Sequence, residues 1–166
     1  EDAIAVAIAE IKCETDFVTK ETSFIDFVEN VGKRVLSDNP ENVEALSAMA
    51  ITDGSVTIDE VRKELISKIG ENMTVRRFER IDAVGQISYY KHGVRIAVLV
   101  DIENGDDALG KDIAMHIAAS KPICISEQDA DQALLDKERE IFIAQAADSG
   151  QLAESIEKMV GGRIKK

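Results

Sequence analysis

The strongest constraint on the fold is a pattern that occurs twice along the chain, an extended apolar run followed by an amphipathic helix. Residues 3–11 form the first run and residues 94–102 the second, and helices are predicted after them over residues 21–36 and 106–120. Such a repeat indicates a weak internal duplication that produces two similar α+β units. We therefore predict an α+β fold with two related small α+β subdomains, antiparallel sheets and a C-terminal helical hairpin.

The first extended run, Ala3–Ile11, is interpreted as a central strand of its sheet. Ile4, Val6 and Ile8 lie on one strand face and alanines on the other, which suits a strand packed on both faces. The helix that follows carries an apolar stripe at helical spacing and ends at Asp38-Asn39-Pro40. The stripe consists of Phe24, Phe27, Val28, Val31 and Val35.

Two further helices are predicted before the middle of the chain. A short helix covers residues 42–50, and a longer one covers residues 58–69. The longer helix has a Thr57-x-x-Glu60 capping box at its start and Gly70 at its end, so both of its ends are well specified.

Three extended runs and another helix follow. The runs cover residues 73–81, 86–90 and 94–102, and the last two should form a hairpin closed by His92-Gly93. The helix over residues 106–120 places Leu109, Ile113 and Ile117 on one face and stops at Pro122.

The chain changes character from Glu127 onward, where two helices are predicted around a break at Ser149-Gly150. Leu152, Ile156 and Met159 form a narrow apolar seam on the second helix. Such a hairpin either packs against itself or forms a dimerisation arm, and both alternatives stay open. The predicted parts are an N-terminal core subdomain (1–88), a C-terminal core subdomain that is incomplete in this chain (89–125), and the helical hairpin or dimerisation arm (126–166).

Composition narrows the class of partner. The net charge of −12 opposes binding to nucleic acid or to an anionic membrane, because both need clustered Lys and Arg. The chain has no run of about 18 apolar residues and no secretory signal pattern. We therefore expect a cytoplasmic protein that binds another protein, with no nucleic acid and no membrane among its partners.

No catalytic or metal-binding pattern occurs in the sequence. Nucleotide-binding loops, zinc-protease motifs and nucleophile elbows are absent, and Cys13, Cys124, His92 and His116 are not grouped as a metal site requires. We predict no enzyme activity, no cofactor and no metal. The two cysteines are interpreted as ordinary half-buried thiols, with a disulfide or a reactive thiol as the alternatives.

The tract Thr15-Asp16-Phe17-Val18 directly follows the first strand and is the main candidate site. Catalysis is a poor explanation for an acidic and an aromatic side chain together, because no nucleophile or tuned base accompanies them. A probe that inserts into a partner explains them better. The alternatives are that Phe17 is a core residue and that Asp16 is a helix cap.

This tract resembles the T-D-F-V signature of translation elongation factor Ts, the family of nucleotide exchange factors for the GTPase elongation factor Tu (EF-Tu). Further tracts resemble the same family in the same order along the chain. They are Lys68–Asn72 leading to Val75–Arg77, then Tyr90–Ile96, Ile113–Pro122 and Glu157–Arg163. The resemblance implies the family's core, lacking the N-terminal helical module and the C-terminal end.

The resemblance also implies a site and a mechanism. Thr15, Asp16, Phe17 and Val18 would bind EF-Tu and dislocate its Mg²⁺ and phosphate contacts, which promotes GDP release. Weaker contacts would come from Ile69, Gly70, His92, Met115 and His116. Core packing remains an alternative for Met115 and His116, a turn role for His92, and a helix C-cap for Ile69 and Gly70. The alternative function is a dimeric scaffold that acts through Leu152, Ile156 and Met159.

Overall fold

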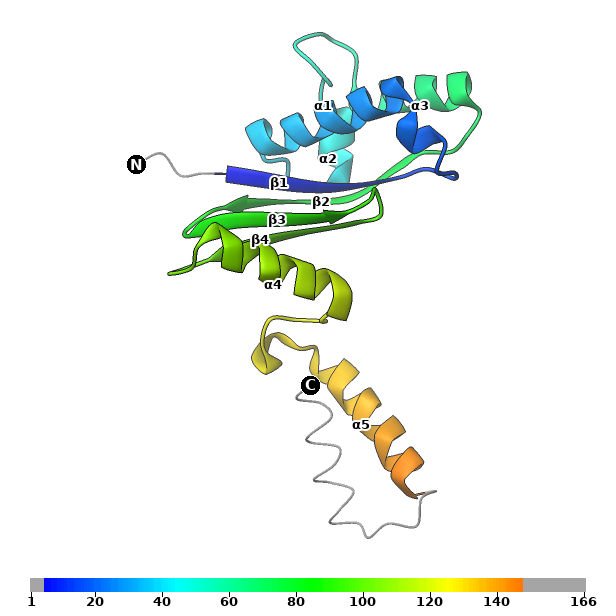
Figure 1. Ribbon diagram of the computed structural model, residues 1–166. Helices are drawn as coiled ribbons and strands as arrows, with labels where there is room; N and C mark the ends of the chain where they lie inside the picture. The colour runs from blue at the N-terminus through cyan, green and yellow to red at the C-terminus, as the bar shows by residue number, and fades with distance from the viewer. Residues whose placement is uncertain (1–4, 148–166) are drawn as a thin grey trace. The chain divides into compact units, whose positions relative to one another are not determined.

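The computed structural model describes residues 5–147 and has the predicted α+β class (Figure 1). Backbone contacts divide the chain into two compact units, Glu1–Ala119 and Ser120–Lys166, and each is described by itself. The elements of the first unit are β1 (Ala5–Lys12), η1 (Val18–Lys20), α1 (Thr22–Asp38), α2 (Val43–Ala48), α3 (Ile58–Ile69), β2 (Thr74–Asp82), β3 (Gln86–His92), β4 (Ile96–Ile102) and α4 (Asp107–Ser120).

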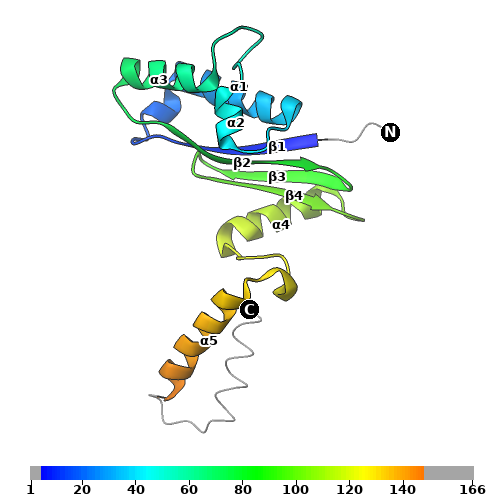
Figure 2. The same cartoon turned by 180° about the vertical axis from the view of Figure 1, so that it is seen from behind.

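The strands form two antiparallel pairs, β1 with β2 and β3 with β4. Figures 1 and 2 show α1, α2 and α3 gathered on one side of the β1–β2 pair, and α4 beside the β3–β4 pair. The predicted hairpin is confirmed: His92 pairs with Ile96, and Gly93 turns the chain with a φ of +59° that glycine tolerates.

The main core lies between the β1–β2 pair and helices α1, α2 and α3. The predicted stripe of α1 is confirmed, because Phe24, Phe27, Val31 and Val35 are buried and Val28 packs against them. The remaining buried members of this core are Val18, Leu46, Ile58, Leu65, Met73 and Val75. Their burial removes apolar surface from water, which is the main stabilising contribution in a domain of this size.

Helix α3 begins and ends at the predicted residues. The Thr57 hydroxyl accepts a hydrogen bond from the backbone N–H of Glu60 at 3.2 Å, and the Glu60 carboxylate accepts one from the Thr57 N–H at 2.8 Å. Gly70 follows the helix with a φ of +82°, a left-handed conformation that costs a side-chain-bearing residue free energy.

Replacing Thr57 with alanine should lower the free energy of unfolding by about 1 kcal/mol, because the Glu60 N–H loses its acceptor. Urea titration of Thr57→Ala beside Thr52→Ala would measure this loss. Thr52 lies in the exposed loop before α3, so its substitution should change stability by less than about 0.5 kcal/mol. Equal stability of the two variants would contradict the capping role.

The interpretation of the first run as a central strand was wrong. Among residues 5–147, β1 pairs only with β2 and therefore lies at an edge of its sheet. All of β1 from Ala5 to Ile11 is half-buried. Apolar residues on both faces of a strand indicate how it is covered, but they do not specify how many strands bond to its backbone.

The predicted apolar face of α4 is also corrected. Leu109 is 49% exposed and Ile113 and Ile117 are only half-buried, whereas the buried residues are Gly110, Ala114 and Ala118. A Cβ placed on Gly110 would come within 2.6 Å of the Ser88 Cβ on β3. Small residues therefore let α4 approach the strand closely, and a pattern of large apolar residues could not reveal that face.

The second unit contains η2 (Glu127–Asp129) and α5 (Gln132–Ala147) within the described range. The second helix of the predicted hairpin, with Leu152, Ile156 and Met159, lies outside the described residues. The predicted boundary at residues 88 and 89 falls within β3, and the three-part division stays a prediction. None of the helices described here has the length and apolar character that a membrane span requires.

Candidate functional site

The loop between β1 and η1, residues 13–17, presents Phe17 to solvent. The Phe17 side chain is 79% exposed, so the alternative that it belongs to the core is wrong. Its neighbour Val18 is only 2% exposed and packs in the main core. The chain is thus anchored at Val18 immediately after the point where the aromatic ring projects.

Local hydrogen bonds shape this loop into a turn. The carbonyl of Phe17 accepts a hydrogen bond from the Lys20 N–H at 3.1 Å, and that of Asp16 accepts one from the Thr19 hydroxyl at 2.7 Å. The residue at the capping position of η1 is Phe17, so Asp16 does not have the cap role considered above.

Glu71 holds one side of the loop. Its carboxylate accepts a hydrogen bond from the Thr15 N–H at 3.0 Å and another from the Thr15 hydroxyl at 2.7 Å. Glu71 directly follows Gly70, the residue that ends α3. The two hydrogen bonds to Glu71 therefore join the loop to the end of α3 and the turn after it, where the predicted contact residues Ile69 and Gly70 lie.

Arg95 holds the other side of the loop. Its Nη2 atom donates to both carboxylate oxygens of Asp16 at 2.7 Å. This hydrogen bonding and the guanidinium charge hold the pKa of the Asp16 carboxyl below its usual value. Arg95 lies in the β3–β4 turn shortly after His92, so the structure brings a third predicted tract to the same loop.

Neither Glu71 nor Arg95 was predicted as a site residue. Both occur inside tracts that resemble the elongation factor Ts family, and that occurrence was the only available signal. Their partners lie 56 and 79 residues away in sequence, which local patterns cannot connect.

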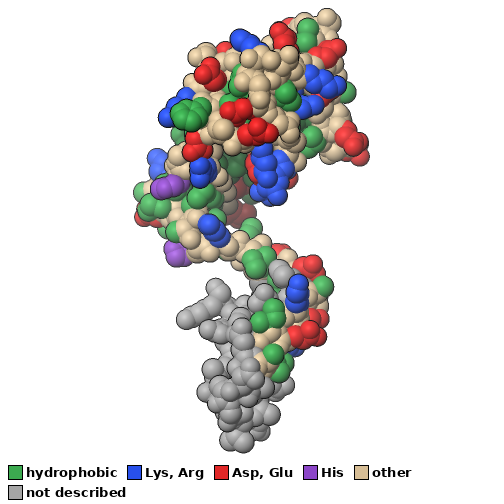
Figure 3. All heavy atoms as spheres, turned by 90° about the vertical axis from the view of Figure 1, so that its right-hand side faces the viewer, with side chains coloured by type: hydrophobic (Ala, Val, Ile, Leu, Met, Phe, Trp, Pro, Cys, Tyr) green, Lys and Arg blue, Asp and Glu red, His purple; other side chains and the backbone are tan. Residues whose placement is uncertain are grey.

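Met115 and His116 are exposed on α4, whereas the small residues Gly110, Ala114 and Ala118 of the same helix are buried. Core packing is therefore wrong for both. Figure 3 shows both histidine side chains of the chain on one face of the first unit, with hydrophobic and basic side chains around them. On β3, His92 Nδ1 lies 3.0 Å from the Tyr90 hydroxyl, so His92 also has a local structural partner.

Cys13 lies at the start of the loop and is half-buried with a free thiol, as is Cys124 in the second unit. Burial raises the pKa of the Cys13 thiol, and the negative charges of Glu71 and Asp16 raise it further. A protonated thiol is a poor nucleophile and a poor metal ligand. Between residues 5 and 147, no group of three or more metal-ligating side chains is present.

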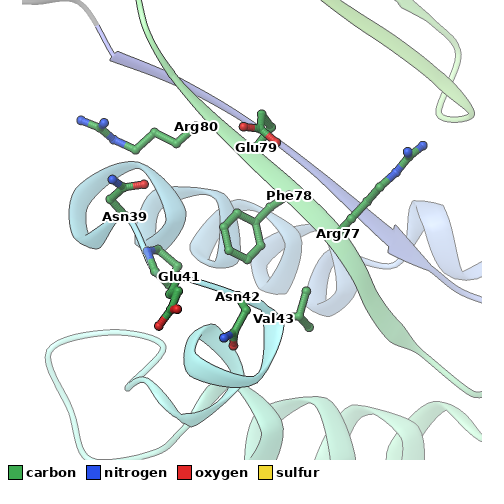
Figure 4. Close-up of a pocket in the computed structure, with 9 residues that line it drawn as sticks. Asn39, Glu41, Asn42, Val43, Arg77, Phe78, Glu79 and Arg80 are labelled. Carbon is green, nitrogen blue, oxygen red and sulfur yellow. The ribbon is translucent and has the colours of Figure 1, made fainter. Parts of the chain in front are cut away.

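A groove on the first unit lies away from this loop. It has a volume of about 470 Å³ and lies between the end of α1, α2 and strand β2 (Figure 4). Phe78 points into it toward α2. Arg80 at its rim donates to the Leu36 carbonyl at 3.0 Å and to Asp82 at 2.7 Å. No residue of the candidate site lines this groove.

Comparison with known proteins identifies the family. The family model described as "Elongation factor TS" matches residues 14–166. The chain is 54% identical over 168 residues to elongation factor Ts of Thioalkalivibrio sulfidiphilus and 52% identical over 167 residues to that of Methylococcus capsulatus. Both matches cover 100% of this chain and 57% of the relative's length. The chain therefore belongs to the elongation factor Ts family.

Proposed function

We propose that this chain is a guanine nucleotide exchange factor for EF-Tu in translation elongation, which binds EF-Tu·GDP and promotes GDP release. Family membership supports the partner. The observation that carries the proposal is the 79% exposed Phe17 on a loop whose neighbouring side chains are held in place. A large aromatic ring exposed beside a fixed carboxylate is suited to insertion into another protein.

The proposed mechanism is displacement of groups in the GTPase. A GTPase holds its nucleotide through phosphate contacts and a Mg²⁺ ion that requires near-ideal octahedral geometry, so a small displacement weakens both. Phe17 would insert between side chains of EF-Tu near that site, with Asp16 close to the metal. Thr15 shapes the loop through Glu71, and the buried Val18 supports it from the core.

This mechanism makes the factor and GDP mutually antagonistic. If the factor weakens GDP binding, GDP must weaken factor binding by the same ratio. A coupling of about 10⁴-fold would require about 5.5 kcal/mol of differential interaction. One buried aromatic anchor contributes about 2–4 kcal/mol by alanine scanning, so other contacts must supply the rest.

The weaker contacts are proposed at Ile69, Gly70, His92, Met115 and His116. Ile69 and Gly70 directly precede Glu71, and His92 lies three residues before Arg95. Because Glu71 and Arg95 bond to the loop, these three residues lie in the two turns that hold it. Met115 and His116 are exposed on α4 and available to another part of the partner. We further propose that the protein acts in the cytoplasm, is not an enzyme and carries no cofactor.

The direct test is the rate of fluorescent GDP release from EF-Tu in a stopped-flow instrument. Adding the chain should accelerate release in a concentration-dependent and saturable manner. A full-length family member serves as the positive control, and excess unlabelled GDP should compete with the chain for EF-Tu. No binding and no acceleration, with an active positive control, would refute the proposal for this chain.

A further inference from the structure

We propose that Glu71 and Arg95 are positioning residues that clamp the Thr15–Phe17 loop and hold Phe17 ready for insertion. The clamp itself concerns only the free chain. Its consequence for GDP release rests on the proposed function. The two residues reach the loop from different turns, Glu71 from the α3–β2 turn and Arg95 from the β3–β4 turn.

The geometry of each contact restricts a different part of the loop. Glu71 accepts from both the backbone N–H and the hydroxyl of Thr15, which fixes the main chain as well as the side chain. Arg95 donates to both oxygens of Asp16 and so orients the carboxylate next to Phe17. Charge-assisted hydrogen bonds of this kind are stronger than neutral ones. Phe17 thus lies between two restrained residues and the buried Val18.

A contribution to global stability does not explain these contacts. The Arg95 and Asp16 side chains are 75% and 67% exposed, and exposed ion pairs contribute little to folding. Ordering a loop before binding, by contrast, removes an entropic cost from association. The clamp therefore acts on how readily Phe17 enters the partner.

The mobility of residue 17 can be measured without a partner. The chain has no tryptophan, so Phe17→Trp creates a single tryptophan reporter that can be excited selectively over Tyr89 and Tyr90. Time-resolved anisotropy should reveal faster local motion of that reporter in Arg95→Ala and Glu71→Ala backgrounds. Arg95→Lys should restore part of the restraint. Lys63→Ala is the matched control, because it removes another exposed ion pair of 2.7 Å, with Asp59 on α3, and should leave the reporter unchanged.

Unchanged circular dichroism spectra and urea midpoints would exclude unfolding as the cause of increased motion. Equal reporter mobility in the parent, Arg95→Ala and Glu71→Ala chains would overturn the clamp. This outcome does not depend on EF-Tu, so the clamp and the proposed function can fail separately.

GDP release provides the second readout, with Phe17 retained. Arg95→Ala should raise the half-saturating concentration of the chain about fivefold and preserve the limiting release rate, because a mobile loop must be ordered on binding. A direct contact by Arg95 with EF-Tu would also raise that concentration but would leave the reporter mobility unchanged. That combination would overturn the positioning role.

Discussion

Phe17→Ala should abolish most of the acceleration of GDP release by this chain. The aromatic side chain is exposed in the free protein and would become buried in the complex. Truncation of such an anchor costs about 2–4 kcal/mol, which corresponds to a loss of roughly 30- to 1,000-fold. Stopped-flow release of fluorescent GDP from EF-Tu, measured over a range of chain concentrations, gives this ratio directly.

The matched control is Tyr89→Ala, which removes another exposed aromatic ring, 62% accessible on β3. That variant should retain acceleration within about twofold. Both variants should keep the urea midpoint of the parent, since neither side chain belongs to the core. If Phe17→Ala still accelerated GDP release, insertion of the ring would be refuted. The chain would then act on EF-Tu through another part of its surface.

Local signals in the sequence predicted the fold well where short-range hydrogen bonds define an element. Helix α3 was predicted exactly from Ile58 to Ile69, because Thr57 and Gly70 encode its ends within one turn. The buried stripe of α1 was also predicted, since helical periodicity reports which face meets the core. The position of the candidate loop followed from the end of β1.

Long-range pairing could not be predicted in the same way. The number of strands beside β1 depends on backbone bonding that side-chain alternation does not encode. The buried face of α4 consists of small residues, and patterns of large apolar residues direct attention away from it. The tethers Glu71 and Arg95 depend on contacts across 56 and 79 residues, which only the folded structure reveals.

Gly110→Ala should destabilise the packing of α4 against β3, although alanine is a better helix former than glycine. The new Cβ would lie 2.6 Å from the Ser88 Cβ, which is fixed to the strand backbone and cannot rotate away. Overpacking of this kind costs about 1–3 kcal/mol, whereas helix propensity returns up to about 1 kcal/mol. A net loss of up to about 2 kcal/mol in the free energy of unfolding is therefore expected from urea titration.

Gly32→Ala is also a glycine-to-alanine change inside a helix, but it should raise the stability of the chain. Gly32 lies inside α1, and a Cβ built there meets no heavy atom within 4 Å. Only the propensity gain remains, so this variant should be more stable than the parent by up to about 1 kcal/mol. If both alanine variants were more stable than the parent, α4 would be free to move away from β3. The close approach at Gly110 would then not fix the position of the helix that carries Met115 and His116.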